Sequence, residues 1–256
     1  MTAEHLLVAI REGALEIEIN RPEKRNALSR PVLEGIGRVF RSHAGNDGLR
    51  LAILKGAGGR SFAAGGDLSD LANVKGADAA ETMAREAKDA LAAIREFPLP
   101  VVAGLNGDAL GGGAELAVAC DMRVAAVHAR IGFIQGRLAI SSAWGGGVDL
   151  MRLVGSARGL RLLARSELVP ALEAQALGLV DAVATDQQSL DEALAEFVAP
   201  MRAQAPQVMR AFKALAIELR CNGRSALDEI ETRHFGQVWA HPDHDRAVAQ
   251  LLNRKR

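Results

Sequence analysis

The sequence predicts an α/β fold with a helical C-terminal region. Short apolar runs, glycine-containing turns and helix-forming segments follow one another repeatedly along the chain, an order typical of an α/β core. From Leu190 onward the strand pattern stops and the residues favour helix. With 256 residues, of which 49% are apolar, the chain can bury one large core. We therefore expect one α/β core with a helical appendage.

The N-terminal part predicts two strands and a helix. The strands are expected over residues 6–10 and 14–20, because apolar and polar side chains alternate along the second run. Ser29 is placed to cap a helix that has Pro31 just inside its start and extends to about residue 42.

The next part predicts a short buried strand over residues 51–54 and a glycine-containing loop over residues 62–68. One long helix is expected over residues 79–96, and the two prolines that follow end it. A second buried strand is expected over residues 100–105.

Another glycine segment follows that strand and gives the first indication of chemistry. Gly111, Gly112 and Gly113 precede a run of good helix formers in which Glu115 lies in the first turn. Glycines allow a ligand to approach the backbone closely, and N–H groups at a helix start stabilise negative charge. A carboxylate that moves a proton beside such N–H groups suits chemistry that builds charge on an oxygen. The alternative is a tight turn before a buried helix, with Glu115 placed only to suit the helix dipole.

Further along, a strand is expected over residues 122–126, and residues 131–135 lead toward a second glycine triplet. The segment from Trp144 to Gly147 is predicted to open a helix over residues 148–154. Trp144 either packs behind this loop or stacks on a ligand.

Composition and missing motifs exclude several classes of function. Basic and acidic residues balance at 31 each, so neither a nucleic acid nor a membrane surface is indicated as a partner. Two cysteines do not suggest a disulfide framework, and neither a signal peptide nor a membrane span is recognised, so a cytoplasmic protein is expected. Neither a nucleophile elbow nor a phosphate-binding loop is present. His241 and His244 are interpreted as the start of a surface helix and not as a metal site.

The two glycine loops together indicate a binding site for a carbonyl oxygen. A thioester carbonyl held by one N–H from the loop at Gly65-Gly66 and one from the loop at Gly112 would be polarised toward an enolate. Glu115 would then be the group that moves the proton.

At this point the sequence resembles the crotonase (enoyl-CoA hydratase/isomerase) superfamily over nearly its whole length. The resemblance is carried by four segments: residues 20–28, residues 62–68, residues 100–121 and residues 174–180. It implies a crotonase-like spiral of ββα units over residues 1–198 that carries the acyl-CoA site, and a helical region over residues 199–256 for oligomer packing.

The family also implies a homotrimer or a dimer of trimers, and a role in fatty acid metabolism. No permanently bound cofactor is implied, since coenzyme A arrives as part of the thioester substrate.

The resemblance assigns roles to individual residues. Gly66 and Gly112 match the oxyanion-hole donors, and Glu115 matches the first of two glutamates that hydratases use. The residues expected along the nucleotide end of coenzyme A share the two N-terminal motifs: Lys24, Arg25, Ala27, Ala63, Ala64, Asp67 and Leu68.

The sequence departs from the family at the second glutamate, whose place is taken by Gln135. An amide hydrogen-bonds but does not exchange a proton at neutral pH, so water addition by two carboxylates is in doubt. Trp144-Gly145-Gly146 also differs from the common family pattern and is similar to that of some malonyl-type acyl-CoA decarboxylases.

We therefore expect an acyl-CoA enzyme that passes through a stabilised enolate with one carboxylate, either an atypical hydratase or an isomerase. A decarboxylase of methylmalonyl- or ethylmalonyl-type thioesters is the first alternative. A catalytically degenerate acyl-CoA-binding or assembly subunit is the second.

Overall fold

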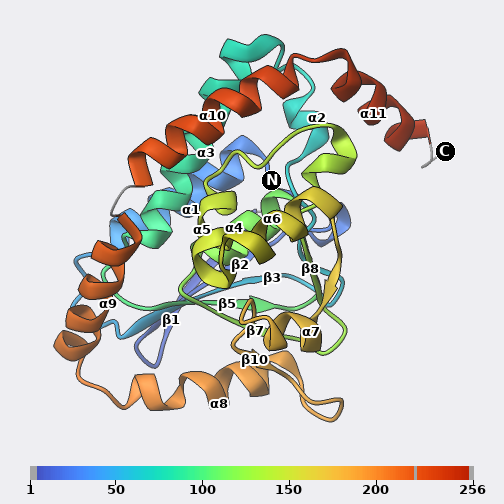
Figure 1. Cartoon of the computed structure of the whole chain (residues 1–256). Coiled ribbons are helices and arrows are strands. Elements are labelled where there is room, and N and C mark those ends of the chain that lie inside the picture. The colour runs from blue at the N-terminus through green and yellow to red at the C-terminus, as the bar shows by residue number, and fades with distance from the viewer. Residues whose placement is uncertain (1–4, 222–223, 254–256) are drawn as a thin grey trace.

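Two β-sheets form the centre of the computed structural model, which describes residues 5–221 and 224–253 (Figure 1). The larger sheet has six strands in the order β1-β2-β3-β5-β7-β10, and the smaller has four in the order β4-β6-β8-β9. Helices cover both faces of the larger sheet, as expected for an α/β core.

The N-terminal hairpin forms as predicted. Strands β1 (Leu6–Arg11) and β2 (Ala14–Ile19) pair antiparallel, and β2 continues the sheet in parallel with β3 (Leu51–Gly56). The short 3-10 helix η1 (Pro22–Lys24) leads toward α1 (Arg30–His43).

The start of α1 differs from the prediction in one detail. Ser29 is the N-cap residue, but its side chain makes no capping hydrogen bond. Instead, the carboxylate of Asp70 accepts the backbone N–H of Arg30 at 2.7 Å. A residue 40 positions away therefore satisfies a donor that we expected the neighbouring hydroxyl to satisfy.

Successive strands then alternate between the two sheets, and each pair is followed by helix. This spiral of ββα units consists of β3 with β4 (Ser61–Ala63), β5 (Val101–Leu105) with β6 (Asp108–Leu110), and β7 (Met122–Ala125) with β8 (Arg130–Gly132). The expected fold class is confirmed. Strand β6 was missed because three residues give no readable period, and it exists only through its pairing with β4 and β8.

The remaining elements of the core follow the same spiral. They are α2 (Leu68–Leu71), α3 (Gly76–Arg95), α4 (Gly112–Ala119), η2 (Gln135–Leu138), α5 (Gly146–Val154), α6 (Ser156–Arg165), β9 (Val169–Pro170), α7 (Ala171–Ala176) and β10 (Ala182–Val183).

The larger sheet buries apolar side chains on both faces. One face packs under α1, α3 and α4 in the main hydrophobic core, and the other packs against α8 (Leu190–Arg202). Figure 1 shows α8 on the opposite side of the sheet from α1 and α3. Helix α4, which carries Glu115, therefore lies on the side away from α8.

The C-terminal part is helical, as predicted. It consists of α8, which runs across the expected boundary at residue 198, followed by α9 (Pro206–Cys221), α10 (Arg224–Trp239) and α11 (Pro242–Asn253). Residues 1–4 and 254–256 of the two expected regions lie outside the described residues.

One expectation for these helices was wrong in part: α11 begins at Pro242, next to the exposed His241, but His244 does not lie at the surface. His244 is only 6% exposed, its ring lies against Trp239, and its Nδ1 atom lies 2.7 Å from the carbonyl oxygen of Leu138. His244 therefore lies in the first turn of α11 as a buried residue that packs this helix against η2. Within the described part of the chain, no helix is long and apolar enough to cross a membrane.

Candidate active site

The side chain of Glu115 is the centre of a buried polar site. It lies in the first turn of α4 and is 2% exposed. One carboxylate oxygen, Oε2, accepts the backbone N–H groups of Trp144 at 2.8 Å and Gly146 at 2.9 Å. The other, Oε1, accepts the N–H of Ala143 at 3.3 Å. These three amides form a cradle that binds the carboxylate as an anion.

Close approach of the backbone makes this cradle possible. A Cβ atom placed on Gly146 would lie 2.4 Å from Cγ of Glu115, so only glycine fits at this position. The contact joins the start of α4 to the start of α5. Both glycine segments are visible in the sequence, but no local pattern predicts that the N–H of Gly146 donates to Glu115.

Gln135 completes the surroundings of Glu115. The amide donates from Nε2 to Oε1 of Glu115 at 2.8 Å. Because an anionic carboxylate only accepts, the nitrogen of the amide is the atom that faces it. The other amide atom, Oε1 of Gln135, is buried and has no hydrogen-bond partner in the described part of the chain. Gln135 therefore contacts Glu115 and also presents an unsatisfied acceptor.

The two glycine loops lie against each other, although 46 positions separate Gly66 from Gly112. The carbonyl oxygen of Ala63 lies 2.0 Å from where a Cβ of Gly113 would be, so the loop at the end of β4 touches the start of α4. Among the described residues, the N–H groups of Gly66 and Gly112 donate to no protein group. The loops thus leave two unpaired donors at neighbouring places.

The indole ring of Trp144 lies against both of these glycines. A Cβ atom on Gly112 would lie 2.3 Å from Cζ3 of the ring, and one on Gly66 would lie 3.7 Å from Cη2. The ring is 5% exposed. The structure therefore places the tryptophan as packing on the glycine loops, which is the first of the two alternatives that the sequence left open.

A buried ion pair supports the cradle from behind. Arg95, at the end of α3, donates from Nη2 to the carbonyl oxygen of Trp144 at 3.0 Å and from Nε to Asp149 at 2.8 Å. Arg95 and Asp149 are each 5% exposed. Asp149 also accepts from Arg220 of α9 at 3.3 Å. No sequence signal identified Arg95 or Asp149, because the helices that carry them are brought together only by folding.

The predicted coenzyme A residues lie around the first glycine loop. The cations of Lys24 and Arg25 are about half exposed (50% and 39%) and reach toward Asp67 and Asp108 at 3.6 and 3.7 Å, respectively. The carbonyl of Ala27 accepts from Arg21. Ala63 ends β4, Ala64 follows it and donates its N–H to the carbonyl of Arg25, and Leu68 starts α2.

Asp67 is held by protein contacts. The carboxylate accepts the N–H of Ser69 at the start of α2 and pairs with Arg21 at 2.7 Å. Burial raises the pKa of Asp67, but hydrogen bonds from Ser69 and Arg21 and the positive charge of Arg21 outweigh this effect and lower the pKa to about 2. The aspartate fixes the loop that contains Gly66 and is charged at neutral pH.

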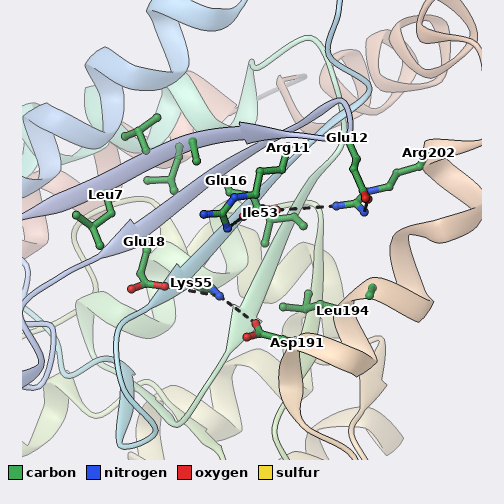
Figure 2. A pocket seen from close by; sticks show the side chains of 14 residues that line it. Leu7, Arg11, Glu12, Glu16, Glu18, Ile53, Lys55, Asp191, Leu194 and Arg202 are labelled. Carbon is green, nitrogen blue, oxygen red and sulfur yellow. Dashed lines mark hydrogen bonds and ion pairs between the residues drawn. The ribbon is translucent and has the colours of Figure 1, made fainter.

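The structure has cavities on both sides of the larger sheet. A pocket of about 380 Å³ lies between α1 and α3, and Leu28, Leu71, Met83 and Trp144 are among its lining residues. A larger groove of about 680 Å³ lies on the α8 side of the sheet (Figure 2). Each cation lining that groove is paired with a carboxylate: Arg11 with Glu16, Arg202 with Glu12, and Lys55 with Glu18 and Asp191. The groove is remote from Glu115, and we assign no ligand to it.

Other reactive groups do not form a second site. Burial raises the pKa of the Cys120 thiol to about 12, so this cysteine is not a thiolate nucleophile at neutral pH. The ring of His128 is bonded to the carbonyl of Gly59 at 2.9 Å. In residues 5–221 and 224–253, no cluster of three His, Cys, Asp or Glu side chains is arranged to hold a metal ion.

Comparisons with known proteins show the family of the chain. A family model described as enoyl-CoA hydratase/isomerase matches residues 9–255. Crotonyl-CoA hydratase of Syntrophomonas wolfei is 31% identical, and the alignment covers 100% of this chain and 98% of that protein. The 2,3-dehydroadipyl-CoA hydratase of Escherichia coli is 32% identical over 98% of this chain and 96% of its own length.

Solved structures share the fold as well. The crystal structure of an enoyl-CoA hydratase/isomerase from Pseudoalteromonas atlantica superposes with a TM-score of 0.86 at 26% identity, covering 98% of each chain. A second, an enoyl-CoA hydratase from Bacillus anthracis, gives 0.80 at 29% identity and covers 99% of this chain and 97% of that one.

Proposed function

Because the chain belongs to the enoyl-CoA hydratase/isomerase family, we propose that it acts on an acyl-CoA thioester through an enolate, with Glu115 as the one proton-carrying carboxylate. The observation that carries the proposal is the contact between Glu115 and Gln135, in which an amide stands beside the carboxylate. A site with one titrating group suits the movement of one proton, and double-bond isomerisation needs no more than that.

The proposed isomerisation uses the unpaired N–H groups of Gly66 and Gly112. They hold the thioester oxygen of a 3-enoyl-CoA, and the carboxylate of Glu115 takes a proton from C2. The C–H electron pair becomes the C1–C2 double bond of a dienolate that keeps its C3–C4 double bond, and the carbonyl π electrons move to the thioester oxygen as its negative charge. Protonated Glu115 then returns the same proton to C4, and the product is the 2-enoyl-CoA. When C4 takes the proton, the C3–C4 pair forms the new C–H bond, the C1–C2 pair becomes the C2–C3 double bond, and the thioester carbonyl re-forms. Removing one such oxyanion donor costs about 3 kcal/mol in comparable enzymes.

Gln135 suits both protonation states of Glu115. Its Nε2 donates to the carboxylate, and after a half-turn of the amide its Oε1 accepts from the carboxylic acid. The three backbone N–H groups of the cradle can only donate, so none of them can accept the hydrogen of the protonated acid. Gln135 is the neighbour that can donate to the carboxylate and accept from the carboxylic acid.

Hydration is the second candidate function, and a separate observation favours it. The unsatisfied Oε1 of Gln135 is a buried acceptor next to Glu115. A water molecule held there and by Glu115 would be placed for addition to a 2-enoyl-CoA. Several relatives carry hydratase names.

We further propose that Lys24 and Arg25, with Ala27 and the loop from Ala63 to Leu68, hold the nucleotide end of coenzyme A. Support comes from the half-exposed cations beside the loop that carries Gly66. Phosphate groups bind such cations through charge-assisted hydrogen bonds.

The helical region over residues 199–256 is proposed to pack against other copies of the chain, as a homotrimer or a dimer of trimers. Three large apolar side chains recur along one side of α9 and are 62–76% exposed: Phe212, Leu215 and Leu219. Light scattering after chromatography tests the proposal, since Leu215→Lys should shift the protein toward the monomer.

A small substrate panel tests the reaction. Crotonyl-, 3-hexenoyl-, methylmalonyl- and ethylmalonyl-CoA are incubated with the enzyme, and products are followed by mass spectrometry and by absorbance of the conjugated thioester. Isomerisation gives conjugation with no mass change, hydration adds water, and decarboxylation loses carbon dioxide. Turnover of the malonyl-type thioesters alone would replace both candidates with a decarboxylase. No turnover, with acyl-CoA still raising the melting temperature, would indicate a binding subunit.

A further inference from the structure

We infer that the indole of Trp144 is the inner wall of the acyl pocket and restricts the substrate to short acyl chains. This inference rests on the proposed function, since it assumes that the thioester oxygen lies at Gly66 and Gly112. It goes beyond that function by naming the residue that selects the acyl chain.

The ring separates the two glycines from a cavity. It touches Gly112 and lies beside Gly66, and it also lines the pocket of about 380 Å³ between α1 and α3. An acyl chain attached to a carbonyl at the glycines therefore meets the ring within its first carbons. The same pocket is lined by the buried apolar side chains of Leu33, Met83 and Ala87. The ion pairs Arg30–Glu86 and Arg41–Asp89 also line it.

Leu28 and Leu71 form the adjoining wall. Leu28 pairs with Gly66 in an isolated β-bridge, and Cδ1 of Leu71 lies 2.9 Å from where a Cβ of Gly66 would be. Both leucines line the same pocket as Trp144. The three side chains together close the short path from the glycines into the pocket.

Backbone contacts hold the ring in place. The N–H of Trp144 donates to Glu115 at 2.8 Å, and its carbonyl accepts from Arg95 at 3.0 Å. With both backbone groups bonded and the side chain 5% exposed, Trp144 is a fixed wall and not a mobile gate. The same loop thus positions both the carboxylate that moves the proton and the ring that limits the length of the acyl chain.

The test compares the binding of butyryl-CoA and octanoyl-CoA, which cannot undergo hydration or isomerisation. Each additional buried methylene is worth about fourfold in affinity. Trp144→Ala should therefore lower the ratio of the octanoyl-CoA Kd to the butyryl-CoA Kd at least ~10-fold relative to the wild type. Trp144→Phe, which keeps most of the packing, should lower the same ratio by about 3-fold. This variant tests the inference if the alanine variant does not fold.

A second substitution separates pocket opening from general loosening. Ala87 lines the pocket from α3 and is 3% exposed. When it is combined with Trp144→Ala, Ala87→Leu should refill the space. The ratio of the octanoyl-CoA Kd to the butyryl-CoA Kd should then return most of the way to its wild-type value. An unaltered ratio in both Trp144 variants, or a gain that Ala87→Leu does not reverse, overturns the inference while leaving the proposed function standing.

Fluorescence gives an independent reading. The chain has two tryptophans, so Trp239→Phe leaves Trp144 as the single emitter. Butyryl-CoA should change its emission, whereas coenzyme A without the acyl group should change it much less. Equal responses to both contradict contact between the ring and the acyl chain. If the wild type binds neither thioester, the proposed function fails and the inference fails with it.

Discussion

Nε2 of Gln135 donates to Oε1 of Glu115 across 2.8 Å, inside a cradle where three backbone N–H groups hold the same carboxylate. The pair consists of one carboxylate and one amide. Each of its atoms has a defined partner except Oε1 of Gln135. The predictions below concern this pair and the residues that position it.

Glu115→Gln should lower turnover of the active thioester by ~10²–10⁴-fold, because the amide cannot carry the proton. Its NH₂ group would also face backbone donors of the cradle, so we expect a loss of about 1–3 kcal/mol in the free energy of unfolding. Steady-state kinetics and urea unfolding measure the two effects. Near-wild-type turnover in the folded variant would show that Glu115 has only a structural role.

Gln135→Glu should raise hydration of crotonyl-CoA by at least ~10-fold, or about 1.4 kcal/mol of barrier. Two carboxylates at hydrogen-bond distance share one proton, so one pKa of the pair is raised. A raised folded pKa means that stability is lost as pH rises through it, and the variant should unfold more readily at pH 8 than at pH 5 relative to the wild type. Gln135→Ala is the control and should not gain hydration activity. If Gln135→Glu brings no gain in hydration, residue 135 does not lie where a carboxylate would act in that reaction.

Gly66→Pro should lower kcat by ~10²-fold, because proline removes the N–H that we propose holds the thioester oxygen. Gly66→Ala is the matched control. Its Cβ would lie 2.9 Å from the flexible tip of Leu71 and at an ordinary contact distance of 3.7 Å from the Trp144 ring, and the N–H remains. Gly112 is a poorer target, because a Cβ there would meet the Trp144 ring at 2.3 Å. If the proline variant turns over as fast as the alanine variant, the Gly66 N–H is not a catalytic donor.

Arg95→Met should destabilise the protein by about 3–5 kcal/mol, because Asp149 is buried and loses a partner. As a positioning residue, Arg95 should affect kcat more than the Kd of coenzyme A, since it holds the cradle loop and not the nucleotide. Arg85→Met on the same helix removes an exposed ion pair with Glu229 and should cost less than about 1 kcal/mol. Equal melting temperatures for the two variants would argue against a supporting role for Arg95.

The folded pKa of Asp67 is about 2, below its ordinary value of 3.8. A depressed pKa means that the carboxylate stabilises the fold above pH 3.8 and that this contribution is lost as pH falls toward 2. Asp67→Asn should therefore be less stable than the wild type at pH 6, and the difference should shrink between pH 4 and pH 2. Urea unfolding at several pH values measures this effect. Parallel stability curves would contradict the ion pair with Arg21.

The sequence by itself determined the α/β class, the N-terminal hairpin, the long helix before the prolines and the helical C-terminal part. Each of these follows from a local period or a turn residue, which a chain carries in consecutive positions. The resemblance to the family also indicated four candidate catalytic residues: Gly66, Gly112, Glu115 and Gln135.

Only the tertiary structure decided how these residues meet. Asp70 replaces Ser29 as the cap partner of α1, and β6 forms because two other short strands flank it. Gly146 of the second glycine triplet joins Ala143 and Trp144 in the cradle of Glu115. Arg95 and Asp149, which are 54 positions apart in the sequence, form a buried pair between two helices. Such contacts depend on which surfaces are buried together, and burial is a property of the whole packed chain that no local pattern encodes.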